Sequence, residues 1–204
     1  MTKAVFLIFT TFSNCFMESD LYMFLNKNTV KIKKLEFLAR GKRSRVYVGF
    51  LKNKKVAVKI SKRAVIESKW LKLLNKKSIG PKLIKVEKGK LIYEYVEGKR
   101  IGDCLKDKNI KTIIKKILKQ CRILDKLKIN KKELVNPYKH ILVNKNKVVM
   151  IDFERCHKVR KGKNVTQFCE YLMRNKIAAR RKLIPLLKRY KENQNEKNFK
   201  KILD

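Results

Sequence analysis

An acidic residue at the end of an apolar run is the first sign of chemistry in the sequence. The apolar run at 149–151 leads directly into Asp152-Phe153-Glu154. A carboxylate at the end of a rigid strand can hold Mg²⁺ against the phosphates of a nucleotide. Asp152 is therefore a candidate metal ligand and catalytic residue, and the alternative is an ordinary acid in a turn.

A lysine and a glutamate earlier in the chain could complete such a site. Lys59 lies in the run Val56-Ala57-Val58-Lys59-Ile60, whose alternation predicts a half-buried strand. A strand can present a lysine rigidly to phosphates. Glu67 follows eight residues later on a predicted helix and could pair with Lys59. In such a lysine-rich chain, both could instead be solvated surface charges.

These pieces resemble the motifs of the protein kinases. The run around Lys59 is similar to the third strand of kinases, and Asp152-Phe153 is similar to their metal-binding Asp-Phe-Gly motif, with Glu154 in place of glycine. Over residues 39–168 the chain most resembles a small archaeal family of predicted serine/threonine kinases with an Ile-Asp-Phe-Glu-Arg motif. It resembles RIO kinases and lipopolysaccharide-sugar kinases more distantly. The resemblance implies a two-lobed fold that uses ATP and Mg²⁺.

The same resemblance assigns the remaining nucleotide contacts. Gly41, Ser44 and Val46 fall in the loop that covers the phosphates, where only the middle of three kinase glycines survives as Gly41. Small residues there let the backbone approach the nucleotide closely. Glu94 and Val96 fall in the hinge, whose backbone groups meet the adenine edge.

The catalytic loop departs most from the kinase pattern. His140 stands where a metal-binding asparagine is normal, and the only acid in the loop is Glu133, seven residues earlier. A carboxylate there could accept the proton of an acceptor hydroxyl. Asn136 and His140 are the candidates for a second metal contact, although Mg²⁺ prefers oxygen ligands to imidazole. Glu133 could equally be a surface acid.

The segment after this motif is short. Only the nine residues 155–163 separate Glu154 from the helix predicted to begin near Asn164, and no Ala-Pro-Glu motif follows. Kinases use this interval to dock peptides and to switch activity by phosphorylation. The acceptor therefore stays open between the protein itself, a particle-bound protein, a small hydroxylated molecule and water.

Periodicity predicts the elements that would position these residues. Strands are expected at 31–38, 45–50, 55–60, 82–86 and 91–95, with a helix that Ser61 caps and that ends near Asn75. Helices are expected at 110–127, 165–176 and 180–190, a loop at 129–139, short strands at 141–143 and 148–151, and a basic helix or frayed end from 188. The fold class is α+β, a bilobal kinase-like fold with an amino-terminal lobe at 30–97 and a reduced helical lobe at 98–204.

The charge of the chain points to a polyanionic partner. The 55 Lys and Arg residues against 17 Asp and Glu give a net charge of +38. Such an excess attracts RNA, a ribosomal particle or a tRNA. The alternative is compositional drift with many solvated lysines.

The cysteines and the amino-terminal residues indicate the cellular compartment of the protein. Five scattered cysteines without a Cys-x-x-Cys pair, and only two histidines, argue against a structural zinc site and favour a reducing, cytoplasmic setting. Residues 1–29 contain an apolar run that is too short to span a bilayer. They are either a signal-like leader or the product of a misannotated start.

Three functions therefore compete. The first is an atypical ATP-dependent phosphotransferase or ATPase whose catalytic residues are Lys59, Glu133 and Asp152. The second is a weakly active pseudokinase that serves as an RNA-binding module. The third is a membrane-peripheral sugar kinase, which would require a functional apolar leader.

Overall fold

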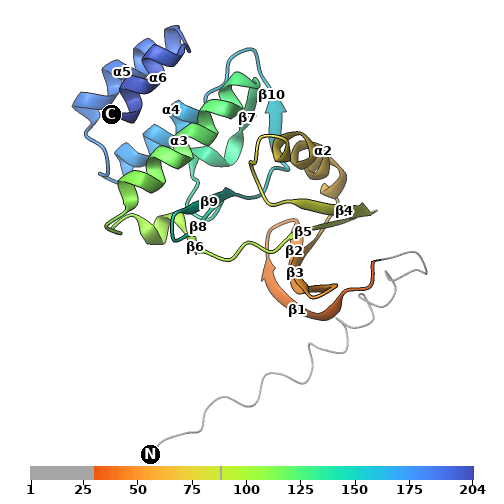
Figure 1. Cartoon of the computed structure of the whole chain (residues 1–204). Coiled ribbons are helices and arrows are strands. Elements are labelled where there is room, and N and C mark those ends of the chain that lie inside the picture. Colours follow the sequence, from red (N-terminus) through yellow and green to blue (C-terminus); the bar gives the residue numbers. More distant parts are fainter. Residues whose placement is uncertain (1–29, 88) are drawn as a thin grey trace, which may run out of the picture.

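The structure is a computed structural model that describes residues 30–87 and 89–204. The expectations for residues 1–29 lie outside this range. Figure 1 shows an antiparallel sheet with one helix at one end of the molecule and a group of helices at the other.

A five-stranded antiparallel sheet forms the first part of the chain. Its order is β1-β2-β3-β5-β4, and its strands are β1 (Lys33–Arg40), β2 (Ser44–Leu51), β3 (Lys54–Ser61), β4 (Leu83–Glu87) and β5 (Lys90–Glu94). All five predicted strands are confirmed, with ends shifted by one or two residues. The β2–β3 hairpin turns through Lys52 and Asn53, both at positive φ, as the tight turns favoured between antiparallel strands require.

Helix α2 (Ala64–Asn75) packs on this sheet and buries Glu67 and Leu71. The prediction that Ser61 caps the helix is wrong. Ser61 is the last residue of β3, and its hydroxyl accepts a hydrogen bond from the Arg63 amide at 3.1 Å. The helix starts at Ala64, two residues later than a Ser61 cap requires.

The second part of the chain places two small sheets against helices. Strands β6 (Lys99–Arg100), β8 (Ile141–Asn144) and β9 (Lys147–Met150) form one sheet, and β7 (Ile129–Lys131) pairs with β10 (Cys156–Lys158) in the other. A 3-10 helix covers Lys132–Val135. The loop predicted at 129–139 is therefore wrong at its start. The boundary predicted at residues 97–98 falls between β5 and β6, and it stays a prediction.

Helix α3 (Ile110–Lys126) provides much of the core beneath these strands. Its predicted apolar face is buried at Ile113, Ile117, Leu118, Cys121 and Leu124. Helix α4 (Asn164–Arg174) packs against it, and α5 (Arg180–Glu192) and α6 (Glu196–Leu203) lie side by side (Figure 1). The alternative of a frayed tail is wrong, because Phe199 and Ile202 of α6 are buried.

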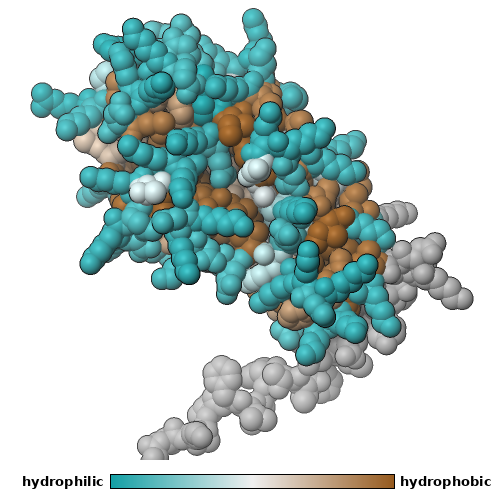
Figure 2. Space-filling view, viewed as in Figure 1, coloured by the Kyte–Doolittle hydropathy of each residue, from teal (hydrophilic) through white to brown (hydrophobic). Residues whose placement is uncertain are grey.

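The surface is strongly polar, as the composition requires. Figure 2 shows hydrophilic side chains over most of one face, with apolar patches between them. Cys104, Cys121, Cys156 and Cys169 are free and buried. Within residues 30–87 and 89–204, no helix is long and apolar enough to cross a membrane.

Candidate active site

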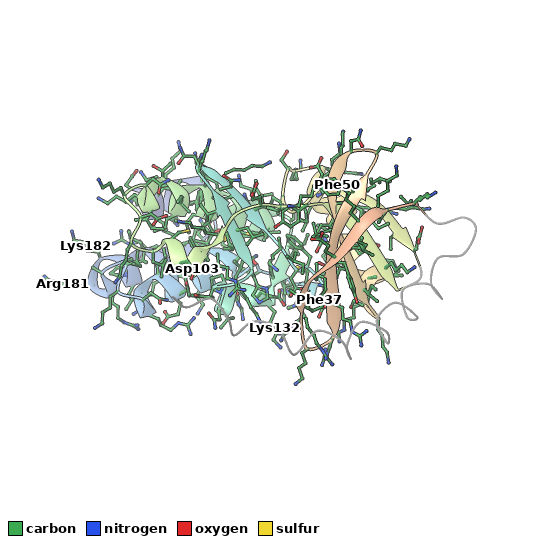
Figure 3. The ribbon with its side chains drawn as sticks, turned by 90° about the horizontal axis from the view of Figure 1, so that it is seen from below. Phe37, Phe50, Asp103, Lys132, Arg181 and Lys182 are labelled. Carbon is green, nitrogen blue, oxygen red and sulfur yellow. The ribbon has the colours of Figure 1, made fainter. Side chains whose placement is uncertain are left out.

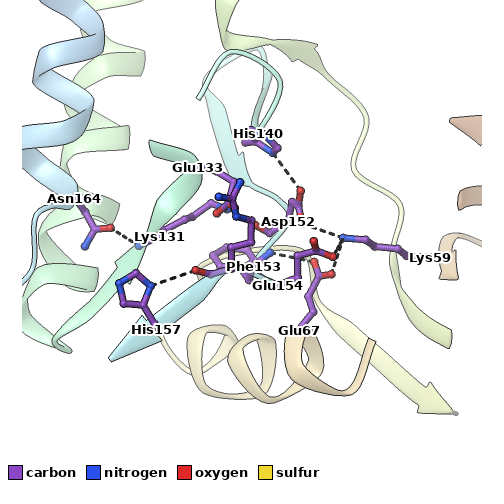
Figure 4. A network of polar contacts seen from close by, with 11 residues as sticks. Lys59, Glu67, Lys131, Glu133, His140, Asp152, Phe153, Glu154, His157 and Asn164 are labelled. Atoms are coloured by element: carbon purple, nitrogen blue, oxygen red, sulfur yellow. Dashed lines mark hydrogen bonds and ion pairs between the residues drawn. The ribbon is translucent and has the colours of Figure 1, made fainter. Parts of the chain in front are cut away.

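Three elements bring Lys59, Glu67 and Asp152 together. Lys59 projects from β3, Glu67 from α2, and Asp152 follows β9 (Figure 4). The Nζ atom of Lys59 lies 2.7 Å from Oε2 of Glu67 and 3.0 Å from Oδ1 of Asp152. The Lys59 and Glu67 side chains are buried, whereas 29% of the Asp152 side chain stays exposed. The order Lys-Glu-Asp seen in the sequence therefore corresponds to one ion-pair cluster, and Asp152 is its most accessible member.

Glu154 joins this cluster and was missed as a site residue. Its Oε2 lies 3.6 Å from Nζ of Lys59, and its side chain is 10% exposed. The other oxygen of Glu67 accepts a hydrogen bond from the Phe153 amide at 3.1 Å, which ties α2 to the Asp152 segment. The sequence signal for Glu154 was its place in the Asp-Phe-Gly motif. In the sequence it stands there only as the residue that replaces the glycine.

The charges of the cluster shift its pKa values. Burial lowers the pKa of Lys59, but the carboxylates of Glu67 and Asp152 outweigh burial and raise it above its ordinary value. Burial is the main reason that the pKa of Glu67 is raised, and Lys59 opposes it. For Asp152, burial alone would raise the pKa, but the attraction of Lys59 and Lys131 lowers it. Asp152 is thus ionised at neutral pH and ready to bind a cation.

Glu133 lies on the other side of Asp152 and is held by a buried lysine. Lys131 has no exposed surface, and its Nζ lies 3.2 Å from Oε2 of Glu133 and donates a hydrogen bond to the backbone carbonyl of Asp152. The Nε atom of Arg155 lies 3.7 Å from the other Glu133 oxygen. Glu133 is therefore a buried carboxylate beside the metal-ligand candidate, and the surface-acid alternative does not fit its 6% exposure.

Of the two proposed second metal contacts, only His140 lies beside Asp152. Nδ1 of His140 is 3.5 Å from Oδ2 of Asp152. Burial, and then the charge of Lys131, lower the pKa of His140 to about 4, so its ring is neutral at pH 7. Asn136 follows the 3-10 helix, is exposed, and makes no side-chain hydrogen bond to Asp152 in the described part of the chain. Both assignments stay predictions.

The phosphate-loop and hinge candidates lie on the neighbouring strands. The Gly41 amide donates to the Ser44 carbonyl at 2.8 Å, which closes the β1–β2 turn, and Val46 pairs with Lys59 across the sheet. The Glu94 amide already donates to the Lys82 carbonyl at 2.9 Å, so its carbonyl is the group left to meet an adenine edge. Val96 is half-buried in the connection that follows. These five nucleotide contacts stay predictions.

Solved structures share this arrangement of elements. The Rio2 kinase from Chaetomium thermophilum, solved as an ADP/Mg²⁺-phosphoaspartate complex, matches with a TM-score of 0.61 and 11% identity over 80% of this chain and 60% of that one. A second solved kinase domain matches with a TM-score of 0.51 and 18% identity over 62% of this chain and 51% of that one. The fold is protein-kinase-like.

The likeness is structural and partial. No protein-family model and no curated protein matches the sequence. The chain spans about 60% of the length of the Rio2 kinase chain. At these identities the comparison supports the kinase-like fold, and the site must be argued from its own geometry.

The donor set of this kinase-like site fits a hard divalent cation. Ligand oxygens of Glu67, Asp152 and Glu154 lie within 4.8 Å of one another. Oxygen ligands suit Mg²⁺. With Glu133, four carboxylates face the two buried lysines Lys59 and Lys131, so acid is locally in excess in a protein of charge +38.

Proposed function

We propose that the protein is an ATP-dependent phosphotransferase of the atypical protein-kinase type that uses Mg²⁺. The observation that carries this proposal is the buried ion pair of Lys59 and Glu67, 2.7 Å apart, in contact with the more exposed Asp152. A lysine fixed in this way presents its charge rigidly to ATP phosphates. The fold of the Rio2 kinase and of the second kinase domain is consistent with this assignment.

The position of each residue in the site suggests its role in the reaction. Lys59 would bind the phosphates, and Glu67 orients Lys59. Asp152 and Glu154 would hold Mg²⁺, which neutralises the charge that develops on the transferred phosphoryl group. Glu133 would accept the proton of the attacking hydroxyl, and Lys131 fixes the position of Glu133 relative to Asp152. Catalysis would then come mainly from positioning and electrostatic stabilisation.

A pseudokinase that binds RNA is the second candidate. The observation that favours it is the double pairing of Glu133 with Lys131 and Arg155, because a carboxylate held by two cations has fewer oxygens available to an acceptor hydroxyl. The net charge of +38 would supply the RNA affinity. The buried free thiols are consistent with a cytoplasmic setting for either function.

Turnover separates the two candidates. The experiment measures ADP release from Mg-ATP by the purified chain and by its Glu133→Gln variant, which keeps the shape of the side chain. The phosphotransferase predicts turnover that falls at least tenfold in the variant while ATP affinity stays within about threefold. Binding of ATP without consumption by the wild-type chain would contradict the enzyme and leave the binding module.

A further inference from the structure

A groove opens beside Glu133, and Lys59 is not among the residues that line it. It has a volume of about 720 Å³ and is lined by the 3-10 helix Lys132–Val135, by the loop that leads into β8, and by the end of α4. We call it the Glu133 groove. Lys132 lines it. Figure 3 shows Lys132 and Asp103 between the large sheet at one end of the molecule and Arg181 and Lys182 at the other.

Two buried polar atoms line this groove without a hydrogen-bond partner in the described part of the chain. They are Oε1 of Glu133 and the hydroxyl oxygen of Tyr171. The two residues are only 6% and 3% exposed. Buried polar groups are almost always hydrogen-bonded, because leaving them unpaired costs free energy. Both atoms therefore indicate a missing polar ligand in the groove.

The rim of the groove is cationic. Lys132, Lys139, Arg155 and Arg174 line it, and Glu133 is the only carboxylate among the lining residues. Within residues 30–87 and 89–204, Lys132 and Lys139 have no ion-pair or hydrogen-bond partner for their ammonium groups, and both are exposed. Phosphate groups are the anions that such clusters bind.

The cavities of the protein differ in their balance of charge. The cavity beside the candidate hinge has a similar volume of about 660 Å³, and its lysines Lys82 and Lys147 are matched by Glu94 and Glu97. The cavity at the β1–β2 turn is lined by six Lys and Arg residues and by no carboxylate. The Glu133 groove, with four Lys and Arg residues and one carboxylate among its lining residues, therefore belongs with the cationic cavities of the described residues.

An aromatic wall gives the groove a fixed shape. Tyr138 is 41% exposed, yet its hydroxyl donates to Oδ1 of Asp103 at 2.5 Å. Its ring lies so close to Gly102 that a Cβ atom there would meet it at 1.8 Å. The exposed Tyr138 ring is thus held in place by Asp103 and Gly102, as expected for a side chain that contacts a ligand.

We propose that the Glu133 groove binds an acceptor that carries a hydroxyl group next to a phosphate group. The phosphate meets Lys132, Lys139 and Arg174, and the Tyr171 hydroxyl donates a hydrogen bond to the acceptor. The hydroxyl points to Glu133. The transfer chemistry in this inference rests on the proposed phosphotransferase function. The binding site is argued from the residues of the groove alone.

The phosphoryl transfer needs only ATP, the acceptor hydroxyl and Glu133 as the proton acceptor. The acceptor oxygen forms a bond to the γ-phosphorus of ATP, and the bond from that phosphorus to the β,γ-bridging oxygen breaks. The electron pair leaves with ADP. The hydroxyl proton passes to the Glu133 carboxylate, which lines the groove and whose Oε1 has no hydrogen-bond partner among the described residues. No further reactant is needed.

An acceptor of this kind has two sources, a free sugar phosphate and the end of an RNA chain. Calorimetric titrations of the full chain, without ATP, would use ribose 5-phosphate, a mixed-sequence ribo-oligonucleotide with a 3′-hydroxyl, and uncharged ribose. Saturable binding of ribose 5-phosphate would identify a small sugar phosphate as the ligand. Binding of the oligonucleotide without binding of ribose 5-phosphate would identify RNA as the ligand. Ribose should not bind measurably.

Paired variants separate the groove from general charge. The double variant Lys132→Gln/Lys139→Gln should weaken binding of the phosphorylated probe at least tenfold. The control Lys111→Gln/Lys115→Gln removes the same charge from exposed positions of α3 and should change it less than threefold. Tyr171→Phe, which removes only the unpartnered hydroxyl, should weaken binding about fivefold or more.

Two results would overturn the proposal: no saturable binding of either phosphorylated probe, or equal losses in the groove pair and the control pair. A separate Mg-ATP titration of the same samples keeps the two hypotheses apart. If neither phosphorylated probe binds but Mg-ATP still binds, only the groove proposal is rejected. Failure of Mg-ATP binding rejects the phosphotransferase and leaves the groove as a phosphate site.

Discussion

Lys131, which has no exposed surface, holds its ammonium group 3.2 Å from the carboxylate of Glu133. The same ammonium donates to the backbone carbonyl of Asp152, and it lies 4.6 Å from the centre of the Phe153 ring. One buried lysine thus connects the candidate base to the candidate metal ligand. Its position depends on the pairing of β7 with β10, in which Lys131 faces Cys156.

Removing this lysine should destabilise the protein. Lys131→Met keeps the length of the side chain but leaves Glu133 buried, with Arg155 as its nearest cation at 3.7 Å. An unpaired buried charge costs about 3 kcal/mol. Urea denaturation should show a loss of about that size, whereas Lys132→Met at the adjacent exposed position should change stability by less than about 0.5 kcal/mol. Equal effects at the two positions would show that Lys131 has no special role.

The Lys59–Glu67 pair should show strong energetic coupling. Both side chains are less than a tenth exposed and 2.7 Å apart. A double-mutant cycle with Lys59→Met and Glu67→Gln, read by urea denaturation, should give about 2 kcal/mol. The exposed pair Lys126–Glu196, at a similar 3.0 Å, should give about 0.5 kcal/mol in the same cycle. Similar coupling in both pairs would contradict a buried site around Lys59.

Asn164 should be a structural anchor of the catalytic segment. It is fully buried, its Oδ1 accepts from the Lys131 amide at 2.9 Å, and its Nδ2 donates to Asp125 at 2.7 Å and to the Ile129 carbonyl at 2.6 Å. Asn164→Ala should lower the free energy of unfolding by about 3 kcal/mol, roughly 1 per bond lost. The exposed Asn109→Ala, whose bonds are 3.2 and 3.4 Å long, should cost less than about 1 kcal/mol. A small loss at Asn164 would show that β7 is positioned by other contacts.

Stability should fall in mild alkali because of buried thiols. Burial raises the pKa of Cys169 to about 12, against about 8.5 in an unfolded chain. The thiol's contribution is therefore fully present below pH 8.5 and is lost as pH rises toward 12. At pH 9.5 the loss is about 1 kcal/mol for this thiol.

Comparing two pH values tests this expectation. Urea denaturation of Cys169→Ala at pH 7.5 and 9.5 should show a pH dependence that is smaller than that of the wild-type chain by about that amount. Ser68→Ala, a buried substitution that does not titrate, should lower stability equally at both values. An unchanged pH dependence in Cys169→Ala would mean that the thiol already ionises freely in the folded protein.

The parts of the site predicted from the sequence are those with a local signal. Lys59 sits in an alternating strand, Glu67 one helix later, and Asp152 at the end of an apolar run, and the structure places all three in contact. Their periodicity identified the elements, and the order of motifs placed them relative to one another. The strands of the large sheet and helix α3 were found for the same reason.

The parts that were missed depend on contacts between distant segments. Lys131 is one lysine among many, and only the β7–β10 pairing, with residues about 25 positions apart, buries it. Glu154 gains its role from its contact with Lys59, which lies on β3, far away in the sequence. Helix α6 looked like a polar tail because its two anchoring residues, Phe199 and Ile202, dock on a surface that α3 and α5 provide.

The most direct test of the central claim is a calorimetric titration of ATP into the full chain with and without Mg²⁺. The comparison includes Lys59→Met, Asp152→Asn and the exposed control Lys69→Met, which lies on the same helix as Glu67. The account predicts binding that requires Mg²⁺ and that weakens at least tenfold in the first two variants and less than twofold in the control. No binding by the folded wild-type chain, or equal binding by all four proteins, would contradict a nucleotide site built on Lys59 and Asp152.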